Sequence, residues 1–526
     1  MTGIAKGSLA LVLHAHLPFV RHPEQEQCAQ ERWLFEAITE SYVPLLRTMQ
    51  RLCREHVPFK LTLSVSPTLG SMLSDGLLRR RYLRHLESLI ALAERECERS
   101  DSGLLPLSRW YRQFFAETQR TFVEEWNCDL LAVIRQLCDD GALELIATAA
   151  THAILPILQQ TPASARAQIA IGCDFYRDTF GGEPAGFWLP ECAYAPGIDR
   201  LLQAQNIRWF VVDSHALELA RPPARFGAQS PCFTPAGPAG FARDARASRQ
   251  IWDAKSGYPG DGTYRDFYCD IGFDLTAEEL APLPHAPGQF TGVKYYRVTG
   301  GDGAKQFYEP AVAEESARGH AHHFVEQCIA TLQNAGGEQP ILIAPFDAEL
   351  FGHWWFEGPV FLEQVARIAA AKGLPLSTPS DFLRSDPPLQ IVQPAASSWG
   401  DGGFLDTWLD EKCAWIYPQL FAANQRMTAL ANAHAHHLSR EQERILAQLS
   451  RELLLAQASD WPFHIRNGTG AEYAGRRVRD HVARFHRLAA MLENGDADLD
   501  FLAQCEERDN LLPHLEWRHS APHDQT

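Results

Sequence analysis

Short apolar runs of strand length alternate with longer stretches of helical character through about the first 385 residues. Between the first two runs, apolar residues recur every three or four positions from Leu34 to Leu52, which is helical spacing. Strands that alternate with helical crossovers form parallel sheets, so the sequence predicts an α/β fold. The runs that we interpret as strands are Leu9–Leu13, Phe59–Val65, Leu143–Ala147, Phe187–Leu189, Trp209–Val212, Ile341–Ala344 and Leu374–Ser377.

Three segments depart from this alternation. Residues 70–140 are too long for one crossover and predict a helical insert. Residues 222–247 are rich in Pro, Gly, Ala and Arg without a clean period, which predicts a long irregular loop that acts as a lid. Beyond about residue 385 the chain becomes helical after several prolines, so we expect a catalytic domain over 1–385 and an α-helical C-terminal domain over 386–526.

Charge and composition narrow the possible partners. The 48 Lys and Arg residues against 65 Asp and Glu residues give a net charge of −17, and no run of five basic residues occurs. This balance argues against nucleic acid and anionic membranes as partners, and favours a neutral or cationic substrate. The apolar runs are far shorter than the roughly 18 residues that span a bilayer.

The predicted location is cytoplasmic. The N-terminal residues lack the long apolar region and small-residue cleavage site of a secretory signal. The twelve cysteines are scattered and form no C-x-x-C pair, so we expect reduced thiols rather than a disulfide framework or a zinc ribbon.

Polar side chains follow nearly every predicted strand. In parallel α/β barrels the chemistry takes place at the carboxyl ends of the strands, where the loops converge on one opening. We therefore expect these side chains to gather at one site. They are His14, His16, Thr151, His152, Glu191, Asp213, His215, Asp347 and Glu349.

Glu191 and Asp347 are the candidate catalytic residues. Each directly follows an apolar run, and burial of a carboxylate is costly unless the group is paired or used. Either one alone could equally be an ion-paired core residue or a helix cap. Two such carboxylates on different strands, both beside aromatic residues, favour catalysis.

Aromatic residues accompany these carboxylates along the sequence. Their flat apolar faces suit sugar rings, although many tryptophans simply belong to protein cores. Two carboxylates framed by stacking aromatics indicate a glycosidase or transglycosidase site. The aromatic residues are Trp188, Tyr194, Trp354, Trp355, Phe356, Trp399 and Trp408.

A metal site is the alternative interpretation of the histidines. Metal-dependent amidohydrolases and polysaccharide deacetylases use His and Asp at strand ends as ligands. His14-x-His16, with His152, His215 and Asp213, offers such a set, and spacing alone does not decide between metal binding and substrate hydrogen bonding.

Several multi-residue motifs resemble glycoside hydrolase family 57, and within it the 1,4-α-glucan branching enzymes. The similarity covers essentially the whole chain. The matching motifs are His14 to Phe19, Trp188 to Tyr194, Phe346 to Trp355, Ser397 to Gly400, and the helical run at 453–463 with Glu472 to Ala474.

The resemblance implies an incomplete (β/α)7 barrel with a helical insert and a helical C-terminal domain. It implies a retaining mechanism without metal or other cofactor, in which Glu191 is the nucleophile and Asp347 the general acid/base, with carboxyl groups about 5 to 5.5 Å apart. The implied substrate is an α-glucan such as amylose or glycogen, and the implied product carries α-1,6 branches. The implied substrate-binding residues are His14, His16, His152, Trp188, His353, Trp354, Trp399 and Trp408.

One feature departs from the family pattern. Branching members carry a tyrosine on a flexible loop over the active site, whereas no tyrosine occurs here between Tyr194 and Tyr258. The segment 222–247 offers Phe226, Phe233 and Phe241 instead. The alternatives to branching are therefore α-glucan hydrolysis, 4-α-glucanotransfer and glucan binding with impaired catalysis.

Overall fold

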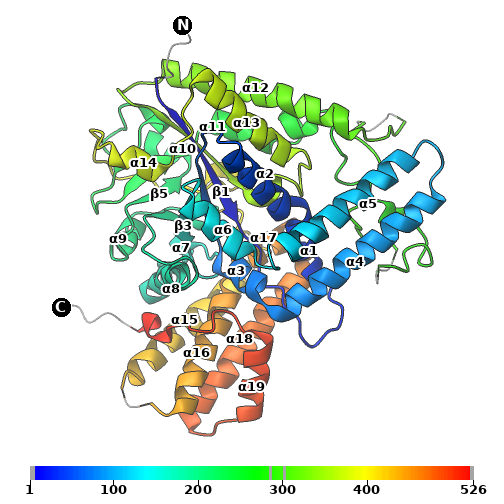
Figure 1. Cartoon of the computed structure of the whole chain (residues 1–526). Helices are drawn as coiled ribbons and strands as arrows, with labels where there is room; N and C mark the ends of the chain where they lie inside the picture. The colour runs from blue at the N-terminus through cyan, green and yellow to red at the C-terminus, as the bar shows by residue number, and fades with distance from the viewer. Residues whose placement is uncertain (1–5, 284–286, 300–303, 437, 522–526) are drawn as a thin grey trace.

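The computed structural model describes residues 6–283, 287–299, 304–436 and 438–521. Figure 1 shows a barrel whose first strand, β1 (Ser8–Ala15), runs from the side of the N-terminus toward a group of C-terminal helices. A long helical hairpin, α4 (Gly76–Arg99) and α5 (Leu105–Arg120), lies beside the barrel. The carboxyl ends of the strands therefore face the C-terminal helices.

The barrel is built from one curled sheet. Its order is β6-β7-β5-β4-β3-β2-β1-β8, and every pairing is parallel except β6 with β7. An isolated parallel bridge from Arg243, directly after β7, to Ile343 in β8 brings the two sides of the sheet together. This arrangement confirms the expected incomplete barrel. The remaining strands are β2 (Leu61–Val65), β3 (Leu143–Thr148), β4 (Gly186–Trp188), β5 (Trp209–Val212), β6 (Cys232–Phe233), β7 (Ala239–Ala242) and β8 (Ile341–Asp347).

Six of the seven predicted strands are present. Their near-continuous apolar character follows from burial on both faces, since Leu9 to Leu13 of β1 are all at most 1% exposed. The seventh run forms only a bridge from Leu376 to Leu9.

The prediction of an irregular loop over 222–247 was wrong. These residues contain β6, β7 and the start of α11 (Ala245–Trp252). β7, Ala-Gly-Phe-Ala, consists mostly of small residues, follows a Pro- and Gly-rich turn and carries no strand signal, but it pairs along its whole length with β5. Phe241 is buried in the core, and the Phe226 ring lies against Gly336, before the start of β8 and away from Asp347.

Helices cover the outside of the sheet. Many begin with proline in the first turn, where its missing N–H costs nothing. The remaining helices and turns before residue 411 are α1 (Glu31–Ala37), η1 (Ile38–Tyr42), α2 (Val43–Arg54), α3 (Pro67–Ser74), η2 (Thr121–Glu125), α6 (Leu130–Asp139), α7 (Leu155–Leu158), α8 (Pro162–Phe180), η3 (Pro190–Cys192), α9 (Ile198–Gln203), α10 (Ser214–Glu218), η4 (Gly227–Gln229), η5 (Tyr258–Gly260), η6 (Ile271–Phe273), α12 (Pro310–Asn334), η7 (Ala348–Leu350), α13 (Gly358–Lys372), α14 (Pro379–Arg384) and η8 (Asp401–Gly403).

The C-terminal part is helical. Its elements are α15 (Ile416–Ala433), α16 (Arg440–Ala456), α17 (Asp460–Asn467), α18 (Ala471–Asn494), α19 (Leu499–Arg508) and η9 (Trp517–Ser520). A capping box of Ser439 and Gln442 begins α16. Near the end of the described residues, Arg518 pairs with Glu443 and His519 pairs with Asp174.

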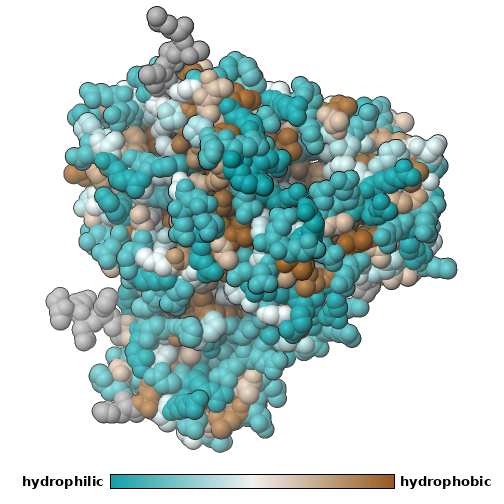
Figure 2. All heavy atoms as spheres, viewed as in Figure 1, coloured by the Kyte–Doolittle hydropathy of each residue, from teal (hydrophilic) through white to brown (hydrophobic). Residues whose placement is uncertain are grey.

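The visible surface is mostly hydrophilic, with small scattered hydrophobic patches (Figure 2). Among the described residues, no helix has both the length and the apolar character needed to cross a bilayer. All twelve cysteines are free.

Candidate active site

Two carboxylates lie near each other at the carboxyl ends of β8 and β4. Asp347 is the last residue of β8 and lies opposite His14 of β1 in the strand register. Glu191 is in the short turn η3 that directly follows β4. Both residues were selected from the sequence because they follow predicted strands, and the fold places both at the carboxyl ends of strands.

The backbone at Glu191 is unusual. Glu191, Cys192 and His152 all have positive φ angles, of 61°, 50° and 57°, although none is glycine. Such conformations cost about 1 to 3 kcal/mol each and persist only where the surroundings hold them. The Trp399 backbone N–H donates to the Glu191 carbonyl at 2.9 Å, which helps to hold this turn.

The surroundings raise the pKa of both carboxyl groups. Burial, followed by the charges of Glu191, Glu349 and Asp460, raises the pKa of Asp347 well above its usual range. Burial also raises the pKa of Glu191 to about 7, although the Trp399 indole N–H, 2.5 Å from Oε2, lowers it. One protonated and one ionised carboxyl group form the pair that retaining glycosidases use.

Three imidazoles and an indole form one stack beside the carboxylates. The ring centroids of His16 and His152 are 3.9 Å apart, those of His14 and His152 4.8 Å, and those of His14 and Trp188 4.9 Å. Trp399 meets Trp188 edge-on at 5.1 Å. The stack brings five of the predicted substrate-binding residues into one wall.

Serine hydroxyls hold one nitrogen of each imidazole. The Nδ1 atoms of His14, His16 and His152 lie 3.1, 2.9 and 2.8 Å from the Oγ atoms of Ser64, Ser66 and Ser459 respectively. Burial, then the neighbouring imidazoles, lowers the pKa values of His14 and His152 well below their usual range, so both rings are neutral. Their Nε2 atoms, and Nε1 of Trp188, are buried without a hydrogen-bond partner. These atoms suit the hydroxyl groups of a sugar.

Asp460 is a site residue to which sequence reasoning gave no role. It begins α17 in the C-terminal domain, and its carboxylate lies 3.2 Å from His16 Nε2. Burial alone would raise the pKa of Asp460, but His16, with smaller contributions from His152 and His464, lowers that pKa to about 2. Asp460 directly precedes Trp461-Pro462-Phe463, but nothing local shows that this helix start reaches β1.

Glu349 has a structural role at the site. Its Oε1 accepts hydrogen bonds from the His16 backbone N–H at 3.1 Å and from the Tyr42 hydroxyl.

Asp213 and His215 form a separate group after β5. His215 Nδ1 is 3.1 Å from Asp213, which also pairs with Arg243, and the Arg243 guanidinium is 5.9 Å from the Trp399 ring.

Three other predicted substrate-binding residues make contacts outside the histidine stack. His353 pairs with Glu40 at 2.8 Å, and Trp354 is 54% exposed and stacks on Phe267 at 4.6 Å. Trp408 is 1% exposed and lies against Gly400 behind the Trp399 loop.

Among the described residues of this site, the three stacked histidines form the group that could hold a metal ion. Ring nitrogens of His14, His16 and His152 lie within 4.8 Å of one another. Serine hydroxyls occupy the three Nδ1 atoms and Asp460 occupies His16 Nε2, whereas Nε2 of His14 and Nε2 of His152 have no partner. Thr151, which also follows β3, instead bonds to the Leu454 carbonyl at 2.5 Å.

Comparison with known proteins identifies the family. The model of glycosyl hydrolase family 57 matches residues 10–255. The 1,4-α-glucan branching enzyme of Thermococcus kodakarensis is 34% identical over 96% of this chain and 77% of that protein. The chain belongs to glycosyl hydrolase family 57.

Solved structures also resemble the chain. The crystal structure of the α-amylase AmyC from Thermotoga maritima has a TM-score of 0.90 and 37% identity, and 98% of this chain and 99% of that chain are covered. The family 57 branching enzyme of Pyrococcus horikoshii has a TM-score of 0.89 and 33% identity, with 99% and 98% covered. A model named 1,4-alpha-glucan branching enzyme, C-terminal, matches residues 419–519.

Proposed function

We propose that this family 57 protein is a 1,4-α-glucan branching enzyme that transfers glucan chains with retention of configuration. The observation that carries the proposal is the pair Glu191 and Asp347, whose pKa values are both raised at the carboxyl ends of the strands. The relatives named as branching enzymes and the match of the C-terminal model support it.

The first step is cleavage. Asp347 donates its proton to the glycosidic oxygen while ionised Glu191 attacks C1, so the C1–O bond breaks and a covalent glycosyl-enzyme forms. The part of the chain that bore the leaving oxygen departs as an alcohol. Asp347 is then ionised and serves as the base.

The second step is transfer. Asp347 removes the proton from the 6-hydroxyl of a glucan chain, and that oxygen attacks C1 and releases Glu191. Two inversions at C1 give net retention and an α-1,6 branch. If water attacks instead, the product is a shortened chain.

The substrate-binding residues have two tasks in this proposal. His14 and His152, whose Nε2 atoms have no partner, hydrogen-bond the sugar hydroxyls, and His16 holds His152 in place by stacking on it. Trp399 provides an apolar face and is supported by Trp188. His353 and Trp354 extend the binding surface beyond the carboxylates. Trp408 supports the loop of Trp399 from behind.

Hydrolysis is the second candidate. The segment between Tyr194 and Tyr258 contains no tyrosine. The structure of an α-amylase from Thermotoga maritima matches almost the whole chain. An active site that admits water to the glycosyl-enzyme shortens chains rather than branching them.

Incubation with amylose separates these functions. The assay measures reducing ends and the chains that isoamylase releases, with the Glu191→Gln variant as a control and with EDTA in a parallel sample. Branches with few reducing ends support branching, and reducing ends without branches support hydrolysis. Loss of activity with EDTA would indicate a metal-dependent hydrolase. No product in any sample would contradict the proposed activity.

We also propose an α-glucan such as glycogen as the partner and the cytoplasm as the location. Twelve free thiols are typical of proteins in a reducing compartment.

A further inference from the structure

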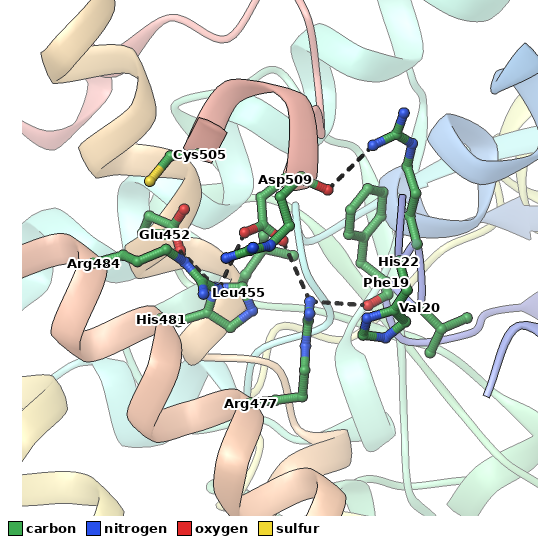
Figure 3. Close-up of polar contacts among 12 residues, drawn as sticks. Phe19, Val20, His22, Glu452, Leu455, Arg477, His481, Arg484, Cys505 and Asp509 are labelled. Carbon is green, nitrogen blue, oxygen red and sulfur yellow. Dashed lines mark hydrogen bonds and ion pairs between the residues drawn. The ribbon is translucent and has the colours of Figure 1, made fainter. Parts of the chain in front are cut away.

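The interior of the C-terminal domain contains a buried ionic network (Figure 3). The Arg484 guanidinium joins two carboxylates: its Nε lies 2.9 Å from Glu452 and its Nη2 lies 3.1 Å from Asp509. His481 Nδ1 lies 2.7 Å from Glu452, and Arg477 Nη2 lies 3.5 Å from Asp509. Both carboxylates are fully buried.

This network is balanced without a metal. Glu452, His481 and Asp509 together offer three ligand atoms. Both carboxylates, however, are already paired with guanidinium groups, so two negative charges meet two positive charges. A cation added there would be repelled by both arginines.

Arg477 also reaches out of the network toward the barrel. Its Nη2 donates to the Phe19 carbonyl at 3.3 Å, and its Cζ lies 5.9 Å from the Trp461 ring centroid. Figure 3 shows this side chain between the network and Phe19. Phe19 follows His16 by three residues, and Trp461 directly follows Asp460.

We propose that Arg477 is a positioning residue that fixes the His16–Asp460 pair at the active site. One planar guanidinium contacts both segments that carry the pair, and Asp509 holds it in place. The inference rests on the proposed function, because its readout is turnover of an α-glucan.

The pair lies next to the groups that react. His16 stacks on His152 at 3.9 Å, and His152 Nδ1 is 3.8 Å from Glu191 Oε1. The charged groups that face Asp347 are Glu191 from η3, Glu349 from η7 and Asp460 from α17. A displacement of Asp460 therefore changes both the stack and the field at Asp347.

The test compares Arg477→Lys with Arg451→Lys. Arg451 is also a buried arginine of this domain, but its bonds go to Gln448 and to carbonyls of Leu511, Leu512 and Pro513, away from the barrel. We expect Arg477→Lys to lower kcat about tenfold with KM changed less than about twofold, because placement of reacting groups is lost rather than binding. Arg451→Lys should keep kcat within about twofold of the wild type.

A double-mutant cycle tests whether Arg477 acts through the His16–Asp460 pair. If Arg477 acts through the pair, Arg477→Lys lowers kcat less than about twofold when Asp460→Asn is already present. The basic limb of the pH profile should also move to lower pH in Arg477→Lys by about half a unit, because Asp460 no longer raises the pKa of Asp347 to the same extent.

Two results would overturn the inference. One is an equal loss of kcat in both backgrounds, and the other is an equal loss in Arg477→Lys and Arg451→Lys. If Arg477→Lys does not fold, Asp509→Asn loosens the same guanidinium and should give a smaller loss in the same direction; an unchanged kcat and pH profile would contradict the idea. A wild type without glucan activity would instead refute the proposed function.

Discussion

At the scale of single residues, Glu191 and Asp347 must hold opposite protonation states in one electrostatic environment. Trp399 favours the ionised form of Glu191 by donating its indole N–H to Oε2. The carboxylates around Asp347 favour its protonated form. Hydrogen bonding and like charge therefore separate the roles of two otherwise similar groups.

This separation predicts a bell-shaped pH profile. Glu191 must lose its proton, so kcat/KM should rise as pH passes about 7, and Asp347 must keep its proton, so the rate should fall at higher pH. Trp399→Phe removes the bond that lowers the pKa of Glu191, so we expect the acidic limb to move upward by about half a unit to one unit. The measurement is kcat/KM against pH.

Trp517→Phe is the matched control. Trp517 donates to Glu443 in the C-terminal domain, and its replacement should leave the profile unchanged. An acidic limb that stays in place in Trp399→Phe would show that this bond does not set the ionisation of Glu191.

Asp347→Asn tests the second role. Without the acid, cleavage of unactivated glucan should fall at least about 100-fold. With an activated aryl α-maltooligosaccharide, Glu191 still forms the glycosyl-enzyme, and added azide should restore turnover and give the α-glycosyl azide. Product analysis by NMR checks this outcome, and a β-glycosyl azide would mean that the two roles are exchanged.

Sequence reasoning found these two carboxylates because each follows an apolar strand. It gave Asp460 no role for a physical reason: Asp460 begins a helix, where an acidic residue is ordinary, and its contact with His16 joins segments far apart in the chain.

At the scale of elements, the segment 397–404 positions Trp399 over Glu191. The Ser397 and Tyr194 backbones form an antiparallel bridge, and His215 Nε2 lies 2.6 Å from the Gly403 carbonyl oxygen. Gly400 directly follows Trp399, and a Cβ added to Gly400 would lie 2.7 Å from the Trp408 ring. The segment has no room to shift without moving Trp399.

Gly400→Ala should therefore damage catalysis. The methyl group must displace Trp408 or the loop, and we expect kcat to fall about tenfold or more while the barrel stays folded. Amylose turnover and thermal unfolding measure the two effects.

Gly319→Ala supplies the comparison for this variant. Gly319 lies inside α12, and no heavy atom lies within 4 Å of an added Cβ. This change should stabilise the protein by about 0.5 to 1 kcal/mol without altering turnover. Normal turnover in Gly400→Ala would contradict a positioning role for the segment.

The apolar strands were predicted from the sequence and β7 was not, because only the apolar strands have a hydrophobic pattern. Runs such as Leu9–Leu13 are buried on both faces and stand out in the sequence. β7 consists largely of small residues and is identified by its pairing with β5 and β6, which no local pattern records.

At the scale of the whole molecule, the net charge of −17 should matter little for a neutral glucan. Raising NaCl from about 50 to about 500 mM shortens the screening length severalfold, yet KM for amylose should change less than about twofold. Initial rates at several salt concentrations test this expectation. A steep rise in KM with salt would point to a charged group in the true substrate.

The contribution of Asp460 and Ser459 has a consequence for how the protein is made. Protein synthesis proceeds from the N-terminus, so the barrel with Glu191 and Asp347 emerges first. Ser459 and Asp460, which contact His152 and His16, follow roughly 110 residues after Asp347, about 5 to 25 s later at ordinary rates of synthesis. The histidine stack is complete only once the last helices have emerged from the ribosome, so chains cut short by premature termination lack a finished site.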